Sequence, residues 1–417
     1  MGAKRVIVVG GGVAGCSAAI AVAKAGLESV LVERMDTLSG TGPLTGHLVQ
    51  YVARMETKLL DGGGKEVIEA LEGLSIFPQR EFGHQVSCIF DTTKIEKAML
   101  TTVEKAGVEV ILRSRVVGVE KEGNKIHRVV LENGARLEGD AFVDATGSTG
   151  GIPVCAEWGV GCVGCSQKCT VFGDRVGLSE AAGVPDLPKT ASYYVCTYIH
   201  PSSIAPWLLR SIQEEESGYF YYQVPEPWQN HDFTSYWPRK DRPVKNNLGR
   251  ERLIYLMPFV KLFVSTIPMD ILHQFPGFED AYVISPMAQT GNCVKTSPGA
   301  PHDETMRVLG LANLFCSGLR SGDFSSLVES IYTGDLAGHN AARTALGITE
   351  LVTFPKTTMM GFFLWEIKKG YSLSDYPPGS PVDRRYLDVG LDVMEPDRIH
   401  ERMNRVGLLG LFGQRPI

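Results

Sequence analysis

The hydrophobic pattern at the start of the chain predicts a strand, a glycine turn and a helix. Residues 6–9 are consecutive β-branched residues, which favours a short buried strand. Residues 10–15 are rich in glycine, and residues 16–26 form an alanine-rich segment that ends in glycine, as helices commonly do. Residues 29–32 then predict a second buried strand, which ends at Glu33.

The following hundred residues predict more strands around one further helix. Asp91 or Thr92 is placed to cap a helix that Gly107 ends, and residues 108–112 predict a third strand. Three short β runs, 115–120, 125–131 and 135–138, are joined by turn-forming residues and predict a meander. Residues 141–144 predict a fourth strand, which leads into Ala145-Thr146-Gly147.

Composition narrows the class of protein. Of 417 residues, 44% are hydrophobic and 21% charged, so a packed core is expected. The net charge of −6 disfavours a generic polyanion binder. Residues 6–23 carry no charge, but their four glycines favour the strand–turn–helix over a membrane span. The nine cysteines and the absence of a secretory signal predict a soluble, cytoplasmic protein that does not insert into membranes.

The glycine turn has the spacing of a dinucleotide-binding site. Gly10 allows a tight turn, Gly12 lets a diphosphate approach the backbone, and Gly15 lets helix and strand pack closely. The start of the helix offers free N–H groups to the phosphates. Glu33 is placed to accept the ribose hydroxyls of an adenosine, and its charge favours NAD or FAD over NADP. A second small-residue loop, residues 39–46, is either a further diphosphate or ribityl contact or an ordinary surface loop.

Residues 4–150 resemble the FAD domain of the glutathione-reductase-like flavoprotein superfamily, in which a meander replaces one crossover helix and an Ala-Thr-Gly turn lies near the nucleotide. The resemblance implies an α/β fold, with a Rossmann-type FAD-binding domain and an inserted α+β substrate domain. It also implies FAD as the cofactor. The residues expected to contact FAD are Gly10, Gly12, Val13, Ala14, Gly15, Glu33, Arg34, Gly42, Val116, Ala145 and Gly147.

Four cysteines follow the Ala-Thr-Gly turn at the spacing C-x6-C-x2-C-x3-C. They are Cys155, Cys162, Cys165 and Cys169. Thiolates at this spacing suit a [4Fe–4S] cluster or zinc. Alternatively, Cys162 and Cys165 form a catalytic redox dithiol beside the flavin, or all four are structural.

The next segment is aromatic. Residues 192–240 hold twelve aromatic side chains, which suit either a wall for a flat or apolar substrate or the core of a small domain. Four histidines are loop-like candidates for substrate contact, although each one alone is more often structural. They are His200, His231, His273 and His302.

Residues 313–318 predict a final strand that enters a glycine turn, and residues 326–343 predict a long helix whose N-terminus faces the flavin. Related flavoproteins carry Gly-Asp at this strand end, where the aspartate holds the ribityl chain. Here Leu319 follows Gly318, so that aspartate is missing or displaced to Asp323.

Residues 273–362 resemble the flavin-dependent tRNA-modifying family, which includes the folate- and FAD-dependent tRNA uracil-5-methyltransferases. Val328-Glu329-Ser330, Leu336-Ala337-Gly338 and Asn340-Ala341-Ala342-Arg343 carry the likeness. The departures are that family's catalytic cysteine context near residue 50 and its basic pattern around Asn292, which this chain lacks. The resemblance therefore implies a shared scaffold more securely than a shared RNA substrate.

We therefore expect an FAD-binding domain from residues 1–150 and 305–345, a cysteine-rich and aromatic substrate domain from 151–304, and a C-terminal extension from 346–417. The expected function is two-electron FAD chemistry on a small organic substrate, with a homo-oligomer or redox partner allowed. The alternatives are an FAD-dependent enzyme that modifies tRNA uridine, with nucleic acid as the less favoured partner, and a flavin-binding subunit without enzymatic activity. Arg398, Arg402 and Arg405 could line one helical face, which is usually solvated.

Overall fold

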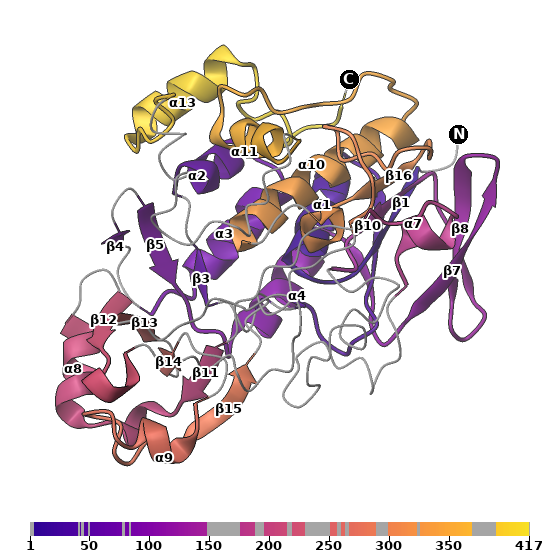
Figure 1. Cartoon of the computed structure of the whole chain (residues 1–417). Helices are drawn as coiled ribbons and strands as arrows, with labels where there is room; N and C mark the ends of the chain where they lie inside the picture. The colour runs from indigo at the N-terminus through magenta and orange to yellow at the C-terminus, as the bar shows by residue number, and fades with distance from the viewer. Residues whose placement is uncertain are drawn as a thin grey trace.

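A parallel five-stranded sheet forms the centre of the computed structural model (Figure 1). The structure describes residues 4–40, 42, 46–48, 51–76, 80–82, 85–147, 176–187, 196–214, 219–229, 251–256, 260–262, 267–288, 299–322, 326–368 and 389–416. The strand order is β16-β10-β1-β2-β6, and every neighbouring pair is parallel. The strands are β1 (Arg5–Val9), β2 (Glu28–Val32), β6 (Glu109–Ile111), β10 (Ala141–Asp144) and β16 (Leu314–Cys316). The predicted α/β class with a Rossmann-type parallel sheet is confirmed.

Two helices cross in close contact on one face of this sheet. They are α1 (Val13–Lys24) and α10 (Leu327–Ala345). A Cβ atom at Gly334 would overlap the backbone of Ala14, and one at Gly338 would overlap the backbone of Ala18. The two helices therefore approach at a distance that only glycine permits. Beside them lie α2 (Tyr51–Leu59), α3 (Gly63–Glu72) and α4 (Ile95–Lys105) (Figure 1).

The meander follows the predicted pattern. It consists of β7 (Val116–Glu122), β8 (Lys125–Leu131) and β9 (Arg136–Glu138). Asn313, directly before β16, joins β8 of the meander to Asp140, which directly precedes β10. Its amide nitrogen donates to the carbonyl oxygens of Ile126 and Asp140, and its amide oxygen accepts from the Ile126 N–H.

One predicted helix start is wrong. The helix expected from Asp91 begins at Ile95, and neither Asp91 nor Thr92 caps it. The Asp91 carboxylate instead accepts from the N–H and hydroxyl of Thr93, and so closes a turn ahead of the helix. This side chain can close a turn or cap a helix, and the turn is the more local of the two.

A smaller unit is built from residues 196–288 and has its own hydrophobic core. Its mixed-order sheet runs β12-β13-β14-β11-β15, with all pairs antiparallel. The elements are β11 (Cys196–Ile199), η2 (Pro201–Ser203), α8 (Pro206–Glu214), β12 (Tyr219–Gln223), η3 (Glu226–Trp228), β13 (Glu251–Leu256), β14 (Val260–Leu262), α9 (Met269–Leu272) and β15 (Val283–Ala288). Tyr222 lies inside its core, stacked on Phe275 with its edge toward Phe278. A separate three-stranded sheet consists of β3 (His47–Leu48), β5 (Gln85–Ile89) and β4 (Arg80–Phe82), in that order.

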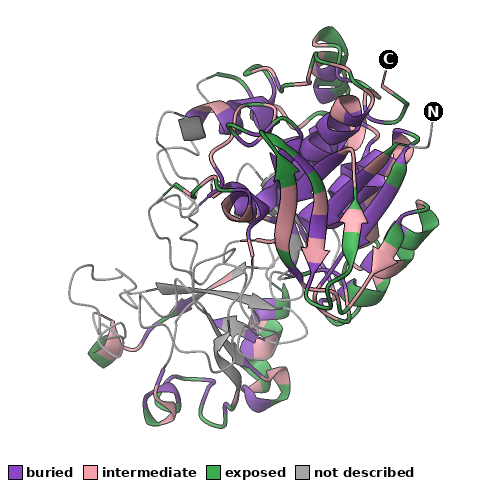
Figure 2. Cartoon of the chain, turned by 90° about the vertical axis from the view of Figure 1, so that its right-hand side faces the viewer, coloured by how far each residue is buried: buried purple, intermediate pink, exposed green. Residues whose placement is uncertain are grey.

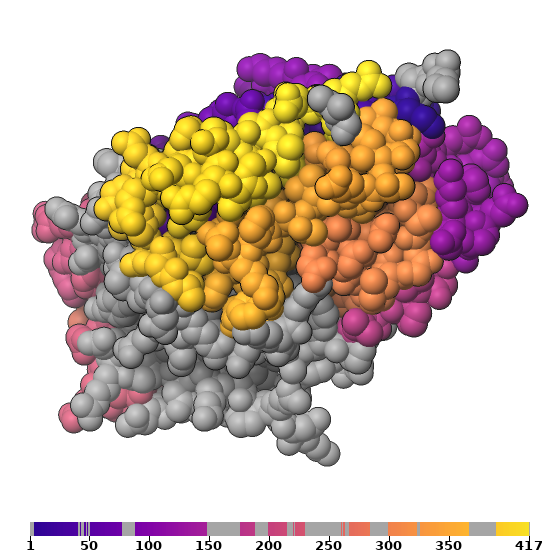
Figure 3. Space-filling view, turned by 90° about the horizontal axis from the view of Figure 1, so that it is seen from above, coloured from indigo at the N-terminus to yellow at the C-terminus, as the bar shows by residue number. Residues whose placement is uncertain are grey.

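The C-terminal residues pack against the large core. Phe354, Met360 and Phe412 belong to the same buried cluster as the central sheet, and Figure 2 shows buried residues concentrated in that part of the molecule. The helices here are α11 (Met359–Lys368) and α13 (Pro396–Arg405), whose surface covers one side of the fold in Figure 3. The domain boundaries expected from the sequence remain predictions.

The attachment of these helices depends on a buried carboxylate. Glu56 of α2 accepts hydrogen bonds from the N–H groups of Met359 and Met360 and pairs with Arg402 of α13 at 2.9 Å. Burial raises the pKa of Glu56, although Arg402 and the two N–H groups oppose that shift. Arg402 therefore points into the protein, while Arg405 pairs with exposed Glu401, so the three arginines do not form one basic face.

Candidate functional site

The glycine turn between β1 and α1 has the geometry that its sequence predicts. Gly10 has a φ of +107°, and a Cβ there would overlap the carbonyl of Ala145. A Cβ on Gly15 would overlap the carbonyl of Gly10. Gly12 differs, because among the described residues a Cβ there would meet only the Cα of Gly40, at 4.0 Å. The space over Gly12 is therefore open, as the approach of a phosphate group to the backbone requires.

The first turn of α1 is also available for an anion. Gly12 is its N-cap, and no side chain caps the helix there. Free N–H groups and the positive end of the helix dipole therefore lie at the open space over Gly12. Val13 and Ala14 stand in this turn and are buried.

Glu33 lies at the end of β2, next to this turn, and its side chain is buried. Its carboxylate accepts from the N–H of Gly11 at 2.5 Å and from the N–H of Met35 at 2.8 Å. These bonds fix the carboxylate beside the glycine turn and leave lone pairs for further donors. The arrangement fits a carboxylate that accepts ribose hydroxyls.

The second small-residue loop packs against the first. The Ser39 N–H donates to the Gly11 carbonyl at 2.7 Å, and Ser39 has a φ of +104°. A Cβ on Gly40 would lie 3.0 Å from the Cα of Gly12. Gly42 turns toward Ile95, at 2.9 Å from its Cβ position, so its side faces the core.

The turn after β16, an edge strand of the sheet, also lies next to the start of α1. Gly318 has a φ of +57°, donates its N–H to Thr333 at 3.0 Å and would collide with Ala14 if it carried a Cβ. The next helix, α10, begins with a capping box between Ser326 and Glu329. Gly318 is thus placed beside α1 and the N-terminal part of α10, whereas Asp323 lies outside the described residues.

The structure adds a group of buried charges that the sequence gave no reason to connect. Arg320 donates from Nε to Asp144 at 2.9 Å and from both terminal nitrogens to Asp186, at 2.5 and 2.7 Å. It also donates to Ser179 at 2.6 Å. Burial opposes the charge, but Asp144 and Asp186 raise the pKa of Arg320 above its ordinary value.

Asp144 connects this cluster to the nucleotide turn. Its other oxygen accepts from the hydroxyl of Thr146 at 2.6 Å, and its backbone carbonyl accepts from the N–H of Ser317. The turns that follow β10 and β16 are therefore held by one arginine–aspartate pair. Nothing in the sequence around Arg320 indicated that its side chain would lie buried beside the Asp144-Ala145-Thr146-Gly147 turn.

The remaining expected cofactor residues are placed as follows. Ala145 is buried against the glycine turn, Gly147 has a φ of +83°, Val116 is buried at the start of β7, and Arg34 is half-buried after Glu33. Cys155, Cys162, Cys165 and Cys169 lie outside the described residues. Within the described ranges, no group of three or more His, Cys, Asp or Glu side chains is arranged to hold a metal ion.

The histidine candidates have local partners. His200 lies 2.7 Å from the Ser202 hydroxyl, His273 lies 2.8 Å from the Ala281 carbonyl, and His302 lies 2.9 Å from the Asp303 carbonyl. His231 lies outside the described residues. These contacts support the structural interpretation of the three that can be seen.

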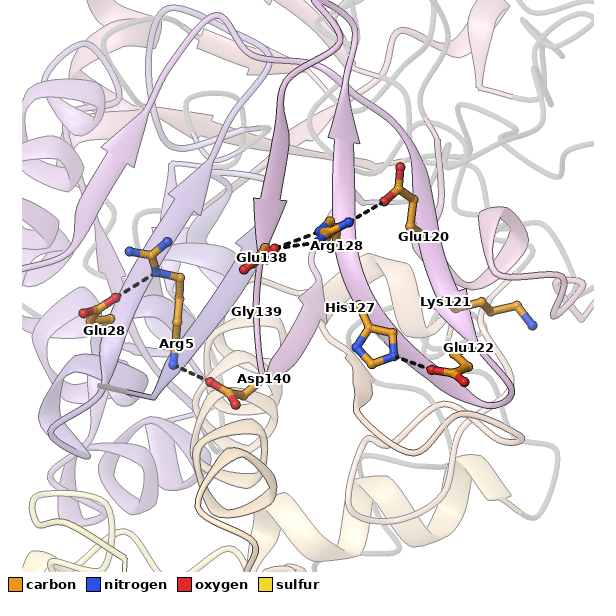
Figure 4. A pocket seen from close by; sticks show the side chains of 10 residues that line it. All are labelled: Arg5, Glu28, Glu120, Lys121, Glu122, His127, Arg128, Glu138, Gly139 and Asp140. Carbon is orange, nitrogen blue, oxygen red and sulfur yellow. Dashed lines mark hydrogen bonds and ion pairs between the residues drawn. The ribbon is translucent and has the colours of Figure 1, made fainter. Parts of the chain in front are cut away.

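An open depression of about 660 Å³ lies beside the meander (Figure 4). Its charged side chains pair with one another: Arg128 with Glu120 and Glu138, and Arg5 with Glu28. Arg5 and Glu28 begin β1 and β2, so this depression is at the amino ends of the parallel strands. Nucleotides bind at the carboxyl ends, so we do not assign it to the cofactor.

Three comparisons with known proteins agree with this geometry. Residues 5–170 match the FAD dependent oxidoreductase family. A tRNA uridine 5-carboxymethylaminomethyl modification enzyme of Chlorobaculum tepidum is 25% identical over 397 residues, which cover 82% of this chain and 63% of that protein. The chain thus spans less than two thirds of that relative's length.

The third comparison is structural. The Aquifex aeolicus GidA structure superposes with a TM-score of 0.68 at 18% identity and covers 98% of this chain and 73% of that one. A chloroplastic zeaxanthin epoxidase of Prunus armeniaca is 28% identical, but over only 167 residues, or 34% of this chain and 25% of that protein.

The amino-terminal part of the chain, residues 5–170, is therefore similar in sequence to FAD-dependent oxidoreductases. The comparisons support both the FAD-oxidoreductase part of the resemblance and its link to flavin-dependent tRNA-modifying proteins, but not the glutathione-reductase-like or methyltransferase specifics. Within the described residues, no helix has the length and hydropathy needed to cross a bilayer.

FAD fits the residues present. The open space at Gly12, the uncapped start of α1 and the buried carboxylate of Glu33 suit the diphosphate and ribose of its adenosine half. The turn at Gly318 and the start of α10 suit the flavin half.

Proposed function

We propose that this flavoenzyme modifies a uridine base in tRNA. The observation that carries the proposal is the extent of the sequence likeness. The match to an enzyme of another class, the zeaxanthin epoxidase, covers 34% of the chain, whereas the match to the tRNA-modifying enzyme covers 82%. The likeness to the tRNA enzyme therefore extends well beyond residues 5–170, which match the FAD dependent oxidoreductase family.

The chain's own residues would bind and orient the cofactor. Gly10, Gly12 and the first turn of α1 would hold the diphosphate, and Glu33 would accept the ribose hydroxyls. Bound FAD would supply two-electron redox chemistry. The dipole of α10 would favour negative charge on the flavin.

The test is binding of FAD-loaded protein to a tRNA transcript at a series of salt concentrations. Contacts to phosphates release counterions, so the affinity should fall by about tenfold or more between 50 and 200 mM salt. Duplex DNA of matched charge is the control for non-specific attraction, which the net charge of −6 should keep weak. Absence of tRNA binding at 50 mM salt contradicts the proposal.

Activity gives a second readout. Nucleosides released from tRNA after incubation with the FAD-loaded protein, a reductant and a one-carbon donor are compared by mass spectrometry. The Gly12→Ala variant is the matched control, because its extra methyl group enters the space reserved for phosphate. A uridine derivative made by the parent protein and absent with the variant supports the proposal.

The cysteine segment supports a second candidate, in which thiols pass electrons between the flavin and a small organic substrate. The spacing of Cys155, Cys162, Cys165 and Cys169 favours it, either with a [4Fe–4S] cluster or with Cys162 and Cys165 as a dithiol. Iron and sulfide assays on anaerobically purified protein separate the two forms. Reoxidation of reduced FAD by small acceptors, without tRNA binding, would favour this candidate over RNA modification.

A further inference from the structure

The order of the strands places the candidate cofactor-binding residues along one edge of the sheet. Gly318 follows β16, the glycine turn follows β1, and Glu33 follows β2. With the diphosphate at β1 and the ribose at β2, an adenine ring that continues in the same direction would lie near the next strand, β6. The residues directly after β6 would then border it.

Arg113 stands in this loop, in an unusual backbone conformation. Its φ of +52° is in the left-handed region, which costs a residue with a side chain about 1–2 kcal/mol relative to the right-handed one. Glycine occupies many such turns, for example Gly26, Gly107 and Gly134, although Ser39, Asp61 and Met306 also have positive φ values. The loop after β6 keeps an arginine at a position where glycine would fit without strain.

Backbone hydrogen bonds hold Arg113 next to the ribose carboxylate. Its N–H donates to the Met35 carbonyl at 2.7 Å, and the Ser114 N–H donates to the Glu33 carbonyl at 2.9 Å. Met35 itself donates to the Glu33 carboxylate. The loops after β2 and β6 are thus joined directly at the residue that would hold the ribose.

The side chain of Arg113 makes one weak, exposed ion-pair contact among the described residues. It is 80% exposed, and Asp36, 59% exposed, approaches it at 3.8 Å. An exposed ion pair at this separation contributes close to nothing to stability. Neither the strained backbone nor the weak ion pair with Asp36 gives the Arg113 side chain a role in the fold, whereas an exposed, planar cation is suited to a flat, electron-rich ligand.

We propose that Arg113 covers the adenine ring of FAD and makes the site select nucleotides that carry an adenosine. A guanidinium group stacks well on a flat π system, which gives a contact worth about 0.5–2 kcal/mol. This inference depends on FAD binding and not on the identity of the substrate.

The test compares Arg113→Gly and Arg113→Lys with the parent protein in binding of FAD, ADP and FMN to the apoprotein. FAD and ADP should each bind about 5- to 10-fold more weakly to Arg113→Gly, whereas FMN, which has no adenosine, should bind unchanged. Arg113→Lys should fall between, since an ammonium group stacks less well. Arg136→Ala, an exposed arginine that pairs with Glu120 on the meander, is the matched control and should alter none of the three.

Thermal unfolding of the apoproteins separates a ligand contact from a structural role. Glycine relieves the left-handed strain, so Arg113→Gly should unfold at the same temperature as the parent or higher. Unchanged affinity for FAD and ADP, or an equal loss for FMN, overturns the proposal. If the parent protein fails to bind tRNA but the pattern with ADP and FMN holds, the proposed substrate is wrong and this inference stands.

Discussion

Arg320 and Asp144 form an ion pair in which both side chains are fully buried, with Nε and Oδ2 2.9 Å apart. The two residues are separated by 176 positions in the sequence. Because Asp144 also binds Thr146, and Arg320 follows Gly318, the pair joins the two turns at the cofactor edge of the sheet.

Replacing Arg320 with methionine should destabilise the protein strongly. Asp144 and Asp186 would remain buried without their cation, and breaking a buried pair by removing one partner costs about 3–5 kcal/mol. Urea denaturation of the apoprotein measures the change. Arg128→Met is the control, because its pairs with Glu120 and Glu138 are exposed and should contribute less than about 1 kcal/mol. A loss at Arg320 no larger than that of the control would show that the buried pair is dispensable.

Two glycines of the nucleotide turn should respond differently to alanine. Gly12→Ala should fold as the parent does, within about 1 kcal/mol, because its Cβ enters open space, but it should bind FAD at least about tenfold more weakly. Gly15→Ala should lose stability even without FAD, because its Cβ overlaps the Gly10 carbonyl. Fluorescence titration with FAD and thermal unfolding of the apoproteins measure both properties. Normal FAD binding by Gly12→Ala would argue against a diphosphate at this turn.

Asp335 predicts a dependence of stability on pH. It is fully buried on α10 and accepts from the Gly63 N–H at 2.8 Å. Burial raises the pKa of Asp335 from 3.8 to about 7, although the N–H groups of Gly63 and Gly64 oppose the shift. Between pH 4 and 7 the folded protein then binds more protons at this site than the unfolded chain, so this residue's contribution to stability falls as pH rises.

Asp335→Asn should remove that dependence. The asparagine oxygen can still accept from Gly63 but does not ionise, so the variant should become more stable relative to the parent by up to about 1.4 kcal/mol per pH unit across this window. Unfolding free energies at pH 4.5 and 7 measure the effect. A constant difference between variant and parent at the two pH values would exclude titration of this carboxyl.

The crossing of α1 and α10 should tolerate no side chain at Gly338. An alanine there overlaps the backbone of Ala18 and should cost about 1–3 kcal/mol. Gly118→Ala, on β7, is the control, since nothing lies within 4 Å of its Cβ position. Alanine is also the better strand residue, so that variant should be neutral or slightly stabilised. Differential scanning calorimetry distinguishes the two, and equal melting temperatures would mean that the helices can move apart.

The sequence by itself determined the parts of this protein that depend on neighbours along the chain. The run of β-branched residues, the glycine turn, the meander with its turn residues and the last strand before Gly318 were all predicted, because strand, turn and helix-cap preferences are local. The start of α4 was predicted wrongly from local preference: the helix begins at Ile95, and the side chain of Asp91 closes a turn before it.

Only the tertiary structure decided which distant groups meet. Arg320 with Asp144, Glu56 with Arg402, and Gly338 with Ala18 are contacts between segments far apart in the chain. No periodicity or spacing encodes them, because a buried charge or a close helix contact is specified by the packing of both partners at once. The same reason placed Arg113 beside Glu33, since the parallel pairing of β2 with β6 brings their carboxyl ends together.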